Sequence, residues 1–156
     1  MELWIDFELL NTTARNHPEW EFVYIGIDYN GAAIDLAKQE NVHNLGPKDY
    51  KHLADYTAFF DCALIPFKTG EIAKATSPVK LFEYMAAGLP TVCTKDLQEC
   101  AGYKNVAMAK NTEDFAIKIA EAIELHKNPE ARMELLNQAK QHTWDRRAEE
   151  IAERIK

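Results

Sequence analysis

Residues 61–94 read DCALIPFKTGEIAKATSPVKLFEYMAAGLPTVCT, and this stretch decides the fold. The apolar run from Cys62 to Ile65 has the length and composition of a strand. Ser77 and Pro78 predict a helix start, because serine is a preferred N-cap and proline suits the first helical position. Apolar residues then recur at helical spacing up to Gly88, and a second apolar run, Thr91 to Cys93, follows. This order predicts a βαβ unit.

The rest of the chain alternates short apolar runs with helical patterns. Further strands are predicted within residues 21–25, 41–45 and 105–109. Helices are predicted over residues 3–14 and 32–38, after Asp49 with Leu53, Tyr56 and Phe60 toward the core, after Thr112, and after Asn128 and Thr143. About five parallel strands between helices predict an α/β, Rossmann-like three-layer domain over residues 1–156. Ligands of such sheets bind beyond the carboxyl ends of the strands.

Composition narrows the functional classes. The 156 residues suit one domain, with 47% apolar and 28% charged residues. A formal charge of −7 argues against a nucleic acid or an anionic membrane as partner, although local donors can still bind a small phosphorylated ligand. Cys62 and Cys93 on apolar runs favour reduced, buried thiols and a cytoplasmic setting. The sequence shows no signal-peptide pattern and no apolar run long enough to span a membrane.

Several kinds of catalytic site are not indicated. The five histidines show no ligand spacing, so we expect no metal. Neither a Gly-x-Ser-x-Gly elbow nor a phosphate-binding P-loop occurs, and residues 26–31 lack the dinucleotide fingerprint. Cys93 is expected to be a buried structural thiol rather than a nucleophile.

The loop and helix over residues 68–83 carry the one constellation that points to a ligand. Three lysines, Lys68, Lys74 and Lys80, gather around the predicted helix start, where we expect free backbone N–H groups at Ser77, Val79 and Lys80. Glu83 follows one turn deeper and could accept hydrogen bonds from vicinal hydroxyls. The alternative reading is a solvated lysine-bearing loop next to an ordinary helix-surface carboxylate.

The block SPVKLFEYMAAGLPTV, residues 77–92, closely resembles the donor-nucleotide motif of GT-B-fold glycosyltransferases of the group 1 (retaining, family 4) type. Four further stretches resemble the C-terminal, donor-binding domain of that family: HPEWEFVYIG (17–26), NVHNLGPKDY (41–50), FDCALIPF (60–67) and AGYKNV (101–106). The likeness covers nearly the whole chain and is greatest to members that build bacterial surface polysaccharides.

The resemblance implies a UDP- or GDP-sugar donor, no metal or other cofactor, and transfer with retention of anomeric configuration. It assigns Glu83 to the ribose hydroxyls, and the helix start around Ser77, Val79 and Lys80 to the diphosphate. The loop at Leu45 and Gly46 is implied to lie near the base. No catalytic residue is assigned.

The chain also departs from the family pattern. Ala75 stands where the family often has a first glutamate, and Glu71 lies nearby. The acceptor-binding domain and the first strand of the donor domain are missing, so we expect an N-terminally truncated domain that is inactive alone. We expect the strands at 21–25 and 62–65 to become neighbours, giving strand order 2-1-3-4-5, or to borrow a strand from a second molecule.

Three functional hypotheses remain at this stage. The first is the donor-binding half of a nucleotide-sugar glycosyltransferase acting in surface polysaccharide synthesis. The second is a non-catalytic nucleotide or nucleotide-sugar binding module that works with a partner chain. The third, a flavodoxin-like signalling domain, ranks last, because only Asp28 approaches the acidic pocket that it needs. The apolar face of the last helix (Trp144, Ile151, Ile155) also predicts a homodimer or another partner contact.

Overall fold

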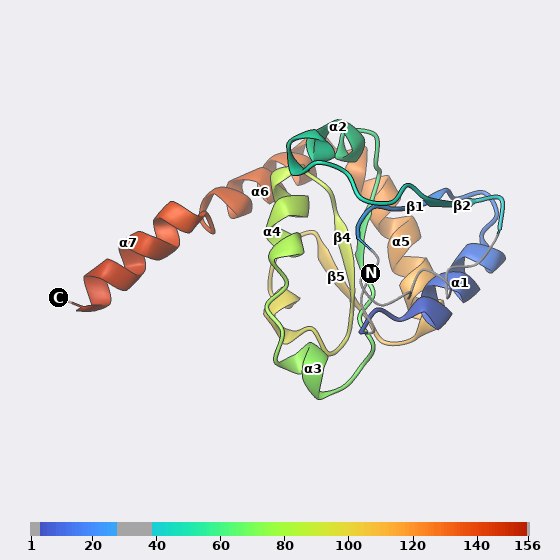
Figure 1. The fold of residues 1–156 in the computed structure, drawn as a ribbon, viewed down its shortest axis with the longest axis horizontal. Helices are drawn as coiled ribbons and strands as arrows, with labels where there is room; N and C mark the ends of the chain where they lie inside the picture. Colours follow the sequence, from blue (N-terminus) through green and yellow to red (C-terminus); the bar gives the residue numbers. More distant parts are fainter. Residues whose placement is uncertain (1–3, 28–38, 156) are drawn as a thin grey trace.

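The computed structural model describes residues 4–27 and 39–155 and contains five strands in two parallel sheets. One sheet pairs β1 (Phe22–Tyr24) with β2 (Val42–Asn44). The other has the order β3-β4-β5, built from Ala63–Ile65, Thr91–Thr94 and Val106–Ala109 (Figure 1). Four strands lie inside their predicted runs, β4 extends one residue past its run to Thr94, and the parallel α/β class is confirmed.

The prediction that β1 and β3 are adjacent strands of one sheet is wrong. In the described part of the chain β1 pairs with β2 and β3 with β4, and no bond joins the two sheets. Figure 1 shows β1 and β2 beside the three-stranded sheet, running crosswise to its strands. Asn41 explains this placement, because its buried amide donates to the carbonyls of Ala14, His17 and Trp20 and so ties β2 to the end of α1.

The backbone just beyond β3 has a different partner. Ile5 forms an antiparallel bridge with Phe67, flanked by bonds of 2.7 Å from the Asp6 amide to the Pro66 carbonyl and from the Lys68 amide to the Trp4 carbonyl. The segment before α1 therefore pairs with the Pro66 carbonyl and the Lys68 amide, just beyond β3.

Seven helices are present in the described residues. They are α1 (Phe7–Asn16), α2 (Leu53–Thr57), α3 (Glu71–Lys74), α4 (Val79–Ala86), α5 (Thr112–His126), α6 (Pro129–Lys140) and α7 (Trp144–Ile155). Asp49, predicted to cap the helix with Leu53, instead caps a 3₁₀ turn, Tyr50–His52, that precedes α2, and α2 itself has no side-chain cap. The helix predicted over residues 32–38 lies outside the described residues. No described helix is long and apolar enough to cross a membrane.

Two predicted helix caps are off by one residue. The N-cap of α4 is Pro78 rather than Ser77, and no side chain caps this helix. The N-cap of α5 is Asn111 rather than Thr112, because the Asn111 side chain reaches the Asp114 amide at 2.9 Å. Asn128 caps α6 as expected.

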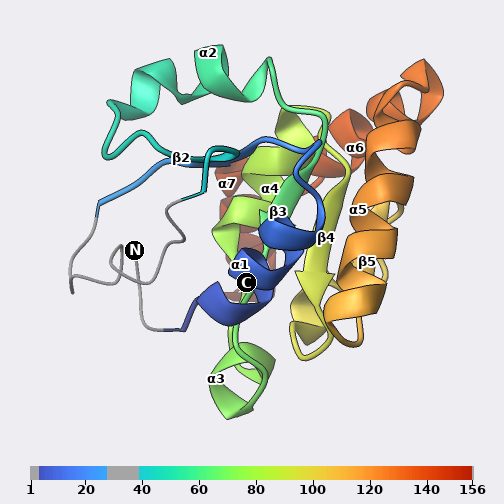
Figure 2. The same ribbon diagram turned by 90° about the vertical axis from the view of Figure 1, so that its right-hand side faces the viewer.

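Helices cover both faces of the three-stranded sheet (Figure 2). One core cluster joins α1 and α5 to β4 around Phe115, and the other joins α4 and α6 to the opposite face around Leu135. Leu53, Tyr56 and Phe60, expected in the core, are only half-buried. Helix α7 extends away from the body and has no buried residue (Figure 1).

Candidate functional site

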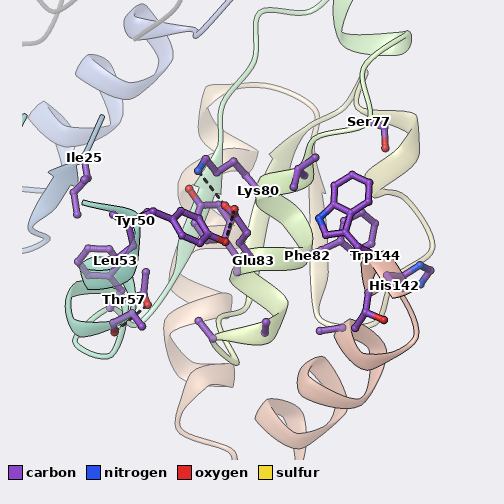
Figure 3. Close-up of a pocket in the computed structure, with 18 of the residues that line it drawn as sticks. Ile25, Tyr50, Leu53, Thr57, Ser77, Lys80, Phe82, Glu83, His142 and Trp144 are labelled. Atoms are coloured by element: carbon purple, nitrogen blue, oxygen red, sulfur yellow. Dashed lines mark hydrogen bonds and ion pairs between the residues drawn. The ribbon is translucent and has the colours of Figure 1, made fainter. Parts of the chain in front are cut away.

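A cavity of about 730 Å³ runs along the outer side of α4 (Figure 3). Residues near β1 and α2 form one wall: Val23, Ile25, Tyr50, Leu53, Ala54, Thr57 and Phe60. The α4 segment contributes Ser77, Val79, Lys80, Phe82, Glu83 and Tyr84, and the start of α7 contributes His142, Thr143, Trp144 and Arg147. The cavity thus brings together three parts of the chain that are distant in sequence.

Glu83 occupies the middle of the cavity and has two partners. Its Oε2 accepts from the Lys80 ammonium at 3.0 Å, since residues three apart share one face of a helix. Its Oε1 accepts from the Tyr50 hydroxyl at 3.4 Å. The side chain of Glu83 is 31% exposed, and Figure 3 shows both contacts on the same side of α4. Each carboxylate oxygen of Glu83 therefore already has one donor in this structure.

The start of α4 opens into the same cavity. Pro78 has no N–H and no side chain caps the helix. Within the described residues, the amides of Ser77, Val79 and Lys80 donate to no protein acceptor, and all three residues are exposed. Free amides at the positive end of a helix dipole form an anion-binding site.

The lysine cluster predicted around this helix start is smaller than expected. Lys80 lines the cavity, whereas Lys68 and Lys74 do not. Lys74 instead pairs with Glu71 at 2.8 Å across α3. Glu71 is itself outside the cavity lining, so the structure brings one of the three lysines to Glu83.

Leu45 and Gly46 lie in the turn after β2, outside the cavity lining. Their backbone groups are already paired: the Gly46 amide donates to Asn44 Oδ1 at 3.1 Å, and the Gly46 carbonyl accepts from Gly26. Gly46 has a φ of 65°, a conformation that favours glycine. The structure therefore does not bring this turn to Glu83, and residues slightly further along, Tyr50 and Leu53, face the cavity instead.

An aromatic cluster that the sequence did not indicate closes the other side. The Phe82 ring lies 4.9 Å from His142 and 5.8 Å from Tyr103, and the Arg147 guanidinium lies 5.0 Å above Phe82. Trp144 is 71% exposed at the start of α7. These contacts hold the first turn of α7 beside α4; no short motif encodes such pairings between distant residues.

Two groups near the site remain uncharged. Burial raises the pKa of Tyr84 to about 12, and the nearby Glu83 carboxylate adds to the shift, so Tyr84 stays a neutral donor. A hydrogen bond with Cys100, together with burial, raises the pKa of the fully buried Cys93. Cys93 is therefore a structural thiol, as predicted. Among the described residues, no group of three metal-ligating side chains occurs.

The model of the family described as "Glycosyl transferases group 1" matches residues 6–125. The chain belongs to the group 1 glycosyltransferases. This confirms that the resemblance of residues 77–92 points to the right family. The matched range contains Tyr50, Lys80 and Glu83, whereas the α7 wall of the cavity lies beyond it.

This group 1 glycosyltransferase is also similar to TuaH of Bacillus subtilis (strain 168), which carries the name of a teichuronic acid biosynthesis glycosyltransferase. The two sequences are 33% identical over 93 residues. The match covers 58% of this chain and 23% of TuaH, so the matched part spans less than a quarter of that relative.

Proposed function

We propose that this chain is the donor-binding half of a retaining glycosyltransferase that transfers a sugar from a UDP- or GDP-sugar during bacterial surface polysaccharide synthesis. One observation carries the proposal: the free amides at the start of α4 and the Glu83 carboxylate open into one cavity of about 730 Å³. Donors for phosphate and an acceptor for hydroxyls are the two groups that a nucleoside diphosphate requires.

The spacing of these groups suits that ligand. Val79 and Glu83 are four residues apart on α4, which places their backbones about 6 Å apart along the helix axis. A diphosphate bound at the helix start therefore leaves its ribose near Glu83. Both oxygens of Glu83 face the cavity and can accept from the vicinal hydroxyls.

Lys80 supports the leaving group in this proposal. When the bond between sugar and phosphate breaks, negative charge accumulates on the departing nucleoside diphosphate. The α4 amides and the Lys80 ammonium stabilise that charge where it develops. Lys80 has to turn from Glu83 toward the phosphate. This movement costs little free energy, because the Lys80 side chain is exposed and exposed ion pairs are weak.

The acceptor side lies outside this cavity in our proposal, on a further domain or a partner chain that closes over the donor. The name of TuaH supports a surface polysaccharide as product. The alternative is a nucleotide-sugar binding module without catalysis. It is favoured by Ala75, an exposed residue at the end of α3 that stands where the family often carries a glutamate.

The test is a titration of the protein with UDP, GDP and adenosine monophosphate, followed by NMR. We expect UDP or GDP to bind in the millimolar range or tighter and to shift the amide signals of Val79 and Lys80 first. Equal, featureless shifts with all three nucleotides would contradict the proposal. Sugar transfer after addition of an acceptor domain from a group 1 enzyme would favour the enzyme over the binding module.

A further inference from the structure

We propose that Tyr50 is the platform for the nucleobase and that its hydroxyl occupies Glu83 only while the donor is absent. This inference rests on the proposed function and adds a residue to it that determines how the nucleoside is held. The observation behind it is the contact of 3.4 Å between the Tyr50 hydroxyl and Glu83 Oε1, across the cavity from α4 (Figure 3).

Tyr50 is an exposed aromatic residue in direct contact with Glu83. It is 72% exposed, yet it lines the cavity and touches its central carboxylate. Its backbone is fixed, because it begins a 3₁₀ turn that the Asp49 side chain caps through the Lys51 amide. A large ring on a capped turn, left open to solvent at the edge of a cavity, is a surface on which a flat ligand can stack.

The order of groups along the cavity places the base at this ring. The phosphate-binding amides lie at the start of α4, and Glu83 follows about one turn later. The base of a nucleoside lies on the side of the ribose away from the phosphates. Beyond Glu83 the cavity is bounded by Tyr50, Leu53 and Thr57, a largely apolar wall with the two hydroxyls of Tyr50 and Thr57.

Exchange of the Tyr50 hydroxyl for the ribose is easy at this geometry. Hydroxyl bonds to oxygen are commonly 2.7–2.8 Å long, so a bond of 3.4 Å is weak. Glu83 gains shorter, charge-assisted bonds from the diol. The hydroxyl is fixed to the ring, so the Tyr50 side chain shifts as a whole to admit the ribose, and its 72% exposure leaves room for this shift. The ring stays beside the ribose, where the base can stack on it.

Two variants and two probes test this assignment. Tyr50→Ala removes the ring and Tyr50→Phe removes only the hydroxyl. UDP carries a base, whereas ribose 5-phosphate presents the same diol and a phosphate without one. We expect Tyr50→Ala to weaken UDP about tenfold, the usual effect of losing one aromatic–base stack, and to change ribose 5-phosphate less than twofold. Tyr50→Phe should bind UDP as well as the wild type or a few-fold tighter.

Phe59→Ala is the matched control. Phe59 is an 85% exposed aromatic residue near the end of α2 that does not line the cavity, so its loss should leave UDP binding unchanged. Equal UDP affinity of Tyr50→Ala and wild type, with Glu83→Gln weakened, would overturn this inference alone. An equal loss for both probes would also overturn it, because Tyr50 would then support Glu83 rather than the base. A wild type that binds neither probe would overturn the proposed function together with it.

Discussion

Replacing Glu83 by glutamine removes a charge from the middle of the cavity and leaves the shape of the side chain unchanged. The carboxylate accepts from Lys80 at 3.0 Å and from Tyr50 at 3.4 Å, and both contacts lie on its cavity side. The amide retains one oxygen acceptor and gains a donor, which faces the Lys80 ammonium or the ribose unfavourably. The variant therefore tests the ribose assignment without opening a hole.

The expected loss of binding is much larger than the loss of stability. Hydrogen bonds to a charged acceptor contribute about 1.5–3 kcal/mol, which corresponds to a fall in nucleotide affinity of about 10- to 100-fold. Folding loses the Lys80–Glu83 pair, which spans three positions of a helix and joins an exposed lysine to a half-buried carboxylate. Such pairs contribute about 0.3–0.5 kcal/mol, so the unfolding midpoint should move little.

Isothermal calorimetry with UDP and GDP measures the nucleotide affinity, and urea unfolding measures the stability. Glu124→Gln is the control, because Glu124 forms the same kind of pair with Lys127 on α5 and does not line the cavity. Both variants should unfold almost like the wild type, and only Glu83→Gln should lose nucleotide. If Glu83→Gln binds UDP and GDP as tightly as the wild type, Glu83 is not the ribose ligand and the reasoning fails.

Three further predictions each concern the replacement of one residue. Lys80→Met should weaken UDP about tenfold and uridine less than twofold, because its proposed partner is phosphate, and the same calorimetry compares the two. Asp114→Asn should lower stability at pH 7 and flatten the acid loss below about pH 4 in urea titrations. The Lys110 amide lowers the pKa of Asp114, so this stabilisation is present above the unfolded pKa and disappears as pH falls through the folded one. Ile151→Glu should abolish the concentration-dependent association that the exposed face of α7 predicts, as measured by sedimentation; a wild type that stays monomeric at high concentration would contradict this.

The sequence predicted the strands well and their assembly less well. Each apolar run became a strand, because local composition and period suffice to specify an extended, buried segment. The pairing of β1 with β3 was wrong, because it depends on long-range contacts that no local pattern carries. Asn41 is an example. Its amide donates to three carbonyls in and after α1, and no sequence pattern around Asn41 predicts these bonds.

In the candidate site, too, the positions within one helix were predictable and the contacts between distant segments were not. Glu83, Lys80 and the free amides of α4 were predictable, because they share one helix whose spacing fixes their relative positions. Leu45 and Gly46 were expected near the base but lie outside the cavity lining. Residues in contact with α4 from elsewhere, such as Tyr50, had no local signal.

The contact between Tyr50 and Glu83 also bears on how tightly such a site can bind. In the structure each oxygen of Glu83 already has a donor, so the ligand exchanges contacts rather than filling empty acceptors. The affinity therefore reflects only the difference in free energy between the bonds of Glu83 to its present donors and its bonds to the ligand. The existing partners are a long hydroxyl bond and an exposed ammonium, both weak, so the difference favours a diol and a phosphate. Salt screens both the Lys80–Glu83 pair and the attraction of Lys80 to phosphate. Part of the effect of salt on nucleotide binding should therefore cancel.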